Sequence, residues 1–288
     1  MTASEVDVLS QEATSRFADL PTMRVHYHDA GSGPALLMLH GGGPGASGWS
    51  NFKQNLRALT PHFRTLLVDQ PGFGRTDKPV HDLPQHGLTA QVLVELLDHL
   101  GIDQATPVGN SMGGAASLEL TLSHPNRVDK LVLMAPAGGS LPVTSAISAE
   151  TKLLRTFYTA PPGPSLERTR ELIHAMVFHG DRVDPQTLQE RFEAAMDPEP
   201  SAYNARMFKN WAAGGAPRQW TRLAEITHPT LLLWGREDKI LPLDSSLHML
   251  HQMPNAQLHV FPNCGHWCQV EAADAFERQI IDFLQPAE

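Results

Sequence analysis

A serine stands between two glycines in the run Gly-Asn-Ser-Met-Gly at positions 109–113. This serine, Ser111, follows an apolar run at 105–108 that is typical of a buried strand, and it precedes a stretch at 112–122 that is typical of a helix. So sharp a strand-to-helix turn needs small flanking residues, and it projects the serine hydroxyl from the top of a sheet. Because a serine hydroxyl is a weak nucleophile by itself, the motif predicts a hydrolase whose serine is activated by a neighbouring base.

A histidine and an aspartate complete the expected catalytic triad. Asp238 follows an apolar run at 230–234, and His266 follows another at 257–261. The order Ser, Asp, His along the chain is that of α/β hydrolases, which place their sites just past the carboxyl ends of strands. Glu237 is the alternative acid, and the sequence favours Asp238.

Backbone N–H groups are expected to hold the oxyanion that forms when the serine attacks a carbonyl. One is the N–H of Met112, directly after the serine, and the other is that of Gly42, with Gly43 as the alternative. Both glycines lie in a glycine-rich loop at 40–45, which lets the backbone approach a substrate closely. The loop lacks the lysine and hydroxyl residue of a nucleotide-binding P-loop, so we expect no nucleotide.

Short apolar runs alternate with helical patterns at both ends of the chain, which predicts a mostly parallel central sheet flanked by helices. The intervening part has helical patterns and no run typical of a buried strand. We therefore expect the α/β class with an α/β-hydrolase fold and a helical cap (lid) insertion. The predicted divisions are the first part of the core at 1–137, the cap at 138–218 and the second part of the core at 219–288.

Composition excludes several classes of protein. The 288 residues carry a net charge of -9 and no basic run, so we expect no nucleic-acid partner. No apolar run is long enough to cross a membrane, and the polar start at 1–17 has no signal-peptide pattern, so we expect a cytoplasmic enzyme. Cys264, His266 and Cys268 do not match the spacing of known zinc sites, so we expect no metal.

Several longer motifs resemble those of the meta-cleavage product hydrolases of bacterial aromatic and steroid degradation. They are His-Gly-Gly-Gly-Pro-Gly-Ala at 40–46, Trp-Ser-Asn-Phe at 49–52, Asp-Gln-Pro-Gly-Phe-Gly at 69–74, Gly-Asn-Ser-Met-Gly-Gly at 109–114 and Cys-Gly-His-Trp at 264–267. The resemblance implies hydrolysis of the C5–C6 carbon–carbon bond of a 2-hydroxy-6-oxo-6-substituted-hexa-2,4-dienoate. The products would be 2-hydroxypenta-2,4-dienoate and a carboxylic acid, formed without a cofactor or a metal.

The resemblance also implies a set of substrate-binding residues. Arg191 matches a carboxylate-binding arginine, and a guanidinium can hold a carboxylate with two hydrogen bonds. Without the resemblance, a surface arginine on a polar helix would be the simpler interpretation. Asn51 and Asn110 match polar positions that hold the dienoate, and Trp267 matches an aromatic residue of the pocket wall.

Two further positions concern the group attached at C6 of the substrate. Met176 and Ile240 fall where several relatives carry an aromatic residue, and softer side chains there would leave a wider or more adaptable wall. The resemblance further implies a homo-oligomer. Two other functions stay open at this point: a carboxylesterase of the same fold, and a non-catalytic ligand-binding protein built on a hydrolase scaffold.

Overall fold

The computed structural model describes residues 8–139, 148–180, 183–211 and 216–285. Its centre is an eight-stranded sheet in the order β1-β2-β4-β3-β5-β6-β7-β8. The pairs β1–β2 and β2–β4 are antiparallel, and the other pairs are parallel. The strands are β1 (Ser15–Asp19), β2 (Arg24–Ala30), β3 (Ala35–Leu39), β4 (Arg64–Val68), β5 (Thr106–Asn110), β6 (Leu131–Met134), β7 (Thr230–Gly235) and β8 (Ala256–Phe261).

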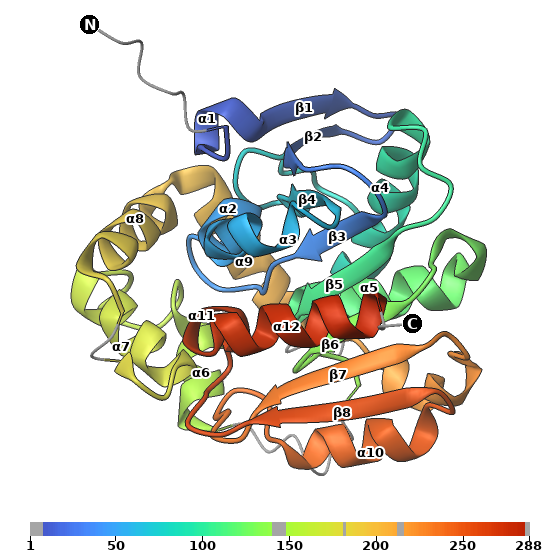
Figure 1. Cartoon of the computed structure of the whole chain (residues 1–288). Helices are drawn as coiled ribbons and strands as arrows, with labels where there is room; N and C mark the ends of the chain where they lie inside the picture. The colour runs from blue at the N-terminus through green and yellow to red at the C-terminus, as the bar shows by residue number, and fades with distance from the viewer. Residues whose placement is uncertain (1–7, 140–147, 181–182, 212–215, 286–288) are drawn as a thin grey trace, which may run out of the picture.

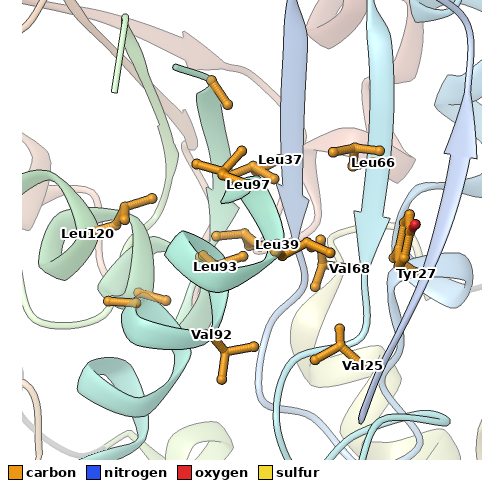
Figure 2. Close-up of a cluster of buried hydrophobic side chains, with 14 of the residues drawn as sticks. Val25, Tyr27, Leu37, Leu39, Leu66, Val68, Val92, Leu93, Leu97 and Leu120 are labelled. Carbon is orange, nitrogen blue, oxygen red and sulfur yellow. The ribbon is translucent and has the colours of Figure 1, made fainter. Parts of the chain in front are cut away.

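Helices cover both faces of the sheet, and this explains why its central strands are apolar throughout. Leu37 and Leu39 of β3 pack against α4 and α5, as Figure 2 shows, whereas Leu36 and Met38 point to the opposite face and pack with α2, α3 and α12. The helices outside the cap are α1 (Gln11–Thr14), α2 (Gly48–Phe52), α3 (Leu56–Leu59), α4 (Gln85–His99), α5 (Met112–Ser123), α10 (Asp244–Gln252), α11 (Cys268–Glu271) and α12 (Ala273–Leu284).

The register of the parallel strands brings the functional loops together. Leu39 of β3 lies opposite Gly109 of β5, so the glycine-rich loop after β3 runs beside the turn that carries Ser111. Gly235 of β7 lies opposite Phe261 of β8, so the two following loops also leave the sheet side by side. The predicted α/β-hydrolase architecture, a mostly parallel sheet between two layers of helices, is therefore confirmed.

In the described parts of the segment between β6 and β7, four α-helices gather at the end of the sheet toward which β7 and β8 point (Figure 1). They pack on the core through one apolar cluster that contains Phe157 and Met207 from the insertion and Phe73 and Met112 from the core. The bounds 138–218 of the cap stay a prediction, because 140–147 and 212–215 lie outside the described residues. The four helices are α6 (Ala149–Thr156), α7 (Leu166–Met176), α8 (Pro185–Met196) and α9 (Pro198–Asn210).

None of the helices in the described part of the chain is both long and apolar enough to cross a membrane. The longest, α4, has 15 residues and packs one face on the sheet.

Candidate active site

Ser111 occupies a strained turn between β5 and α5. Its φ angle is 53° and its ψ angle is -112°, a backbone conformation that residues other than glycine seldom adopt. The turn is held on both sides, because the Ser111 N–H donates to the carbonyl of Met134 at 3.0 Å and the Ser111 carbonyl accepts from the N–H of Ala137 at 2.9 Å. A Cβ atom at Gly113 would collide with the backbone of Leu39, which explains why a glycine follows the serine so closely.

His266 and Asp238 form a buried pair. Nδ1 of His266 lies 2.7 Å from Oδ2 of Asp238, and Oδ1 of the aspartate accepts hydrogen bonds from the N–H groups of Ile240 at 2.8 Å and Leu241 at 2.9 Å. A carboxylate at Nδ1 keeps the proton on that nitrogen, so Nε2 is left with a free lone pair. The pair therefore has the geometry of a base and the acid that orients it.

Glu237, the alternative acid, lies elsewhere. One of its oxygens accepts a hydrogen bond from the N–H of Cys264 at 3.0 Å, and the other pairs with Arg236 at 2.6 Å. The carboxylate thus supports the loop that carries His266 without contacting the imidazole.

Ser111 and His266 line one narrow cavity between the sheet and the cap. Of the residues predicted to bind substrate, only Ile240 is missing from its wall; Ile240 packs in the apolar cluster between cap and core and supports Asp238 through its N–H. The other residues that line the cavity are Gly41, Gly42, Gly43, Asn51, Asn110, Leu154, Met176, Arg191 and Trp267.

Arg191 is a buried cation with an exposed fraction of only 4%. Its guanidinium lies 4.9 Å from the ring centre of Trp267, and Nη1 donates to the hydroxyl of Ser50 at 3.3 Å. Burial lowers the pKa of Arg191 to about 10. No aspartate or glutamate among the described residues forms an ion pair with it. Since a buried charge is normally paired, the cavity is suited to a ligand that brings a carboxylate.

Asn110 offers the cavity an unused acceptor. Its Nδ2 donates to the carbonyls of His266 at 3.2 Å and Met134 at 3.3 Å, while its Oδ1 is buried and has no hydrogen-bond partner among the described residues. An unsatisfied buried acceptor costs about 1–3 kcal/mol, so a ligand hydroxyl or N–H at this point would be stabilised. Asn51 is fixed on α2 by a 2.9 Å bond from its Nδ2 to the carbonyl of Ser47.

The two expected oxyanion donors lie next to each other. A Cβ atom at Gly42 would stand 3.4 Å from Cβ of Met112, so the glycine-rich loop and the start of α5 are in contact. Within the described residues, neither N–H donates a hydrogen bond to another group. Both are therefore free to bind a negatively charged oxygen.

Another serine, histidine and aspartate lie in a row across β1, β2 and the end of β4. The Ser15 hydroxyl is 2.9 Å from Nε2 of His26, and Nδ1 of His26 is 2.7 Å from Oδ2 of Asp69. Ser15 lies in the extended strand β1, which leads into β2 and not into a helix, so it lacks the turn that exposes Ser111. Asp69 also accepts from the N–H groups of Gly48 and Arg75, which indicates that this row joins loops together.

The histidine, cysteine and carboxylate side chains in the described parts of the chain do not form a metal site. No group of three or more His, Cys, Asp or Glu side chains within 8–139, 148–180, 183–211 and 216–285 is placed to hold an ion. Cys264 and Cys268 are buried free thiols.

Comparison with known proteins agrees with this geometry. The model of the α/β hydrolase fold family matches residues 34–273. A 2-hydroxy-6-oxo-6-phenylhexa-2,4-dienoate hydrolase from Burkholderia cepacia is 40% identical, and the alignment covers 96% of this chain and 98% of that protein. The chain belongs to the meta-cleavage product hydrolases of the α/β-hydrolase superfamily.

Solved structures of other meta-cleavage product hydrolases share the whole architecture. One from Pseudomonas fluorescens IP01 superposes with a TM-score of 0.85 at 29% identity, covering 95% of this chain and 98% of that one. The 2-hydroxy-6-oxo-6-phenylhexa-2,4-dienoate hydrolase from Rhodococcus sp. strain RHA1 superposes with a TM-score of 0.83 at 32% identity, covering 94% of this chain and all (100%) of that one.

Sequence reasoning missed Ser50 and Leu154, and it named the glycine-rich loop without assigning Gly41 to the site. Ser50 holds the Arg191 guanidinium, and it lies in the Trp-Ser-Asn-Phe motif, directly before Asn51, where it could have been proposed. Leu154 of α6 lines the cavity from the cap, but a single leucine on an amphipathic helix carries no sequence signal of that position.

Proposed function

We propose that this protein hydrolyses the C5–C6 bond of a 2-hydroxy-6-oxo-6-substituted-hexa-2,4-dienoate, giving 2-hydroxypenta-2,4-dienoate and a carboxylic acid. One observation carries the proposal: Arg191, a buried cation with no carboxylate partner among the described residues, lines the same narrow cavity as Ser111 and His266. An ordinary ester substrate has no need of such a cation, whereas a dienoate brings the carboxylate that would neutralise it.

The polar end of the cavity would bind the dienoate. Arg191 takes the carboxylate, Oδ1 of Asn110 accepts a hydrogen bond from the 2-hydroxyl group, and Asn51 lines the same cavity. The ring of Trp267 keeps the guanidinium in place by a cation–π contact. The reacting carbonyl at C6 then lies toward Ser111.

Bond cleavage needs a carbon leaving group, so the dienol must first become a ketone that can accept electrons. We propose that His266 carries the proton of the 2-hydroxyl group to C5, which gives the 2-keto form. Ser111 then attacks C6 as His266 takes its proton, and the oxyanion binds to the N–H groups of Gly42 and Met112. The C5–C6 electron pair then moves through the conjugated system onto the 2-keto oxygen, and the protonated His266 gives its proton to this oxygen, so the leaving group is the dienol. Water, deprotonated by His266, then releases the acid from the acyl-enzyme and Ser111 regains its proton.

A second version of the same mechanism differs in one step. Ser111 and His266 would direct water onto C6, and the resulting gem-diol would break without an acyl-enzyme. Rapid quenching with a substrate labelled at C6 distinguishes the two versions, because only the first leaves the label covalently attached to Ser111.

The group at C6 would lie against Leu154 and Met176, which are both apolar. We therefore propose an uncharged C6 substituent, aryl or alkyl, and the flexible Met176 can adapt to either. Ile240 would act from behind this wall, through its packing in the cluster between cap and core.

The test is to supply the yellow ring-cleavage products of several catechols and follow the loss of their visible absorbance. Cleavage of at least one, with a much higher kcat/KM than for a 4-nitrophenyl ester, is the expected result. Rapid turnover of the esters with no bleaching of any dienoate would identify a carboxylesterase. Binding of dienoates without turnover of either substrate would identify a ligand-binding protein.

We also propose that the enzyme works in the cytoplasm as a homo-oligomer. Two free buried thiols, Cys264 and Cys268, suit a reducing compartment. The oligomer is inferred from the family resemblance alone, and light scattering of the purified protein tests it: a mass of a single 31.6 kDa chain would contradict it.

A further inference from the structure

Glu271, the last residue of α11, joins two parts of the chain that lie far apart in the sequence. Its Oε1 accepts a hydrogen bond from the N–H of Gly265 at 2.8 Å, and its Oε2 accepts from the N–H groups of Phe178 at 2.6 Å and His179 at 3.2 Å. Gly265 directly precedes His266, and Phe178 follows shortly after α7 of the insertion. One carboxylate thus bridges the loop of the proposed base and the cap.

The same two segments are also in direct backbone contact. The N–H of His266 donates to the carbonyl of Met176 at 2.7 Å. A Cβ atom at Gly265 would stand only 2.7 Å from that carbonyl oxygen and 3.0 Å from the nitrogen of Phe178. The backbone at Gly265 therefore packs directly on the backbone of the cap. Glu271 lies beside this contact and accepts hydrogen bonds from both segments.

The surroundings of the Glu271 carboxylate disfavour its charged form. Burial raises the pKa of Glu271, although three backbone N–H groups act against the rise. No lysine or arginine among the described residues pairs with it. A half-buried carboxylate that makes no ion pair with lysine or arginine costs free energy, and its three N–H partners, together with the nearby His179, offset part of that cost.

We propose that Glu271 is a positioning residue, which holds the imidazole of His266 in line with Ser111 by fastening the His266 loop to the cap. Asp238 orients the ring from one side through Nδ1, and Glu271 sets the backbone from which the ring projects. The proposal rests on the proposed function only in taking His266 as the base for Ser111. Small displacements of a catalytic group lower rates steeply, by about 100-fold for 1 Å.

Two variants act on this contact from opposite sides. Glu271→Gln keeps the shape of the side chain but turns one acceptor into a donor that faces an N–H group. Gly265→Ala leaves the carboxylate in place and pushes the loop away from Met176. The matched control is Glu277→Gln on α12, because that carboxylate also has a raised pKa but accepts its hydrogen bond from Asn55 at 2.8 Å.

The measurement is the rate at which an excess of an organophosphate phosphorylates Ser111, together with the final number of serines labelled. Organophosphates carry no carboxylate, so the rate reports the serine and its base without the dienoate-binding residues. We expect Glu271→Gln and Gly265→Ala to label completely but about 10- to 100-fold more slowly than wild type, with kcat on a dienoate reduced in parallel and KM within about twofold. Glu277→Gln should match wild type.

Wild-type labelling rates in both variants would overturn the proposal. Labelling of only a fraction of the molecules, at the wild-type rate, would also overturn it. That result means that some molecules are misfolded and that His266 activates Ser111 normally in the rest. If the wild-type enzyme is labelled but cleaves no dienoate, the proposed substrate is wrong and the test of Glu271 still stands. Comparison of melting temperatures shows whether a variant has lost its fold.

Discussion

The guanidinium of Arg191 lies 4.9 Å from the ring of Trp267, the residue that directly follows His266 in the chain. The proposed carboxylate-binding group therefore contacts the chain neighbour of the proposed base, and both groups line one cavity, although one comes from the cap and the other from the core. A substrate that bridges them must be held at its carboxylate end while the C6 carbonyl, five carbons from the carboxylate carbon, reaches Ser111.

Replacing Arg191 with alanine should lower kcat/KM on a dienoate by about 10- to 100-fold, because hydrogen bonds to charged groups contribute about 1.5–3 kcal/mol. Activity on a 4-nitrophenyl ester should change little, since that substrate has no carboxylate. Steady-state kinetics on both substrates checks this. Equal losses on the two would show that Arg191 supports the fold of the site instead of binding substrate.

Arg191 should lower the free energy of unfolding of the protein when no substrate is bound. Arg191→Met keeps much of the side-chain volume and removes a buried charge with no partner among the described residues, so we expect the free energy of unfolding to rise by about 1 kcal/mol or more. Urea unfolding of the two proteins measures it. A less stable variant would mean that the contacts of Arg191 with Ser50 and Trp267 outweigh its desolvation.

Ser111→Ala should reduce cleavage at least about 1000-fold while the enzyme still binds dienoate, seen as a spectral change on mixing. Ser15→Ala is the matched control, because Ser15 also contacts a histidine that is bonded to an aspartate. We expect near wild-type cleavage from the control. Cleavage that survives in Ser111→Ala and is lost in Ser15→Ala would identify Ser15 as the nucleophile and contradict the assignment of Ser111.

Asp238→Asn should lower kcat by about 10,000-fold, because an amide no longer holds the proton on Nδ1 of His266. Glu237→Gln keeps a group that can accept from the Cys264 N–H and should retain most of its activity. Single-turnover rates of both variants show which of the two carboxylates orients His266. A larger loss in Glu237→Gln would reverse the choice of acid.

Stability should also depend on pH through His28. Burial lowers its pKa to about 4, from 6.5 in the unfolded chain, so the unfolded state binds more protons between these values and stability falls as the pH falls from about 6.5 to about 4. His28→Phe should remove this contribution, about 1–2 kcal/mol between pH 7 and pH 5, less any loss to solvent screening.

The comparison of wild type and variant is needed because Glu271 and Glu277 act in the opposite sense. Burial raises the pKa of each, so their contribution to stability is present at low pH and is lost as the pH rises. Urea unfolding of both proteins at pH 7 and pH 5 isolates the histidine. Equal pH dependence in the two proteins would contradict the assignment.

Much of this arrangement could be predicted from the sequence, because the order of strands and loops dictates it. The loops after β7 and β8 had to lie together, which is why an acid after β7 could be proposed and His266 selected from 15 histidines, although this argument does not separate Asp238 from its neighbour Glu237. Helix α9 was missed because it begins Pro-Glu-Pro directly after α8; those prolines, which break a helix interior, occupy its first turn, and Asp197 caps it.

Edge strand β1 was missed because only Ala18 of its five residues is buried, so it lacks the apolar run of a central strand. Glu271 could not be found by any spacing rule, because its partners are backbone N–H groups. Such groups are present in every residue except proline, and only the folded chain brings three of them to one carboxylate.

The backbone and the side chain of Met176 contribute to the site in two different ways. Its carbonyl holds the backbone of His266, and any amino acid at this position supplies that carbonyl. Its side chain lines the cavity and packs in the apolar cluster between cap and core. Exchanges of Met176 for other apolar side chains can therefore reshape the cavity while the backbone bond to His266 is kept, which makes position 176 a favourable starting point for directed evolution of this enzyme.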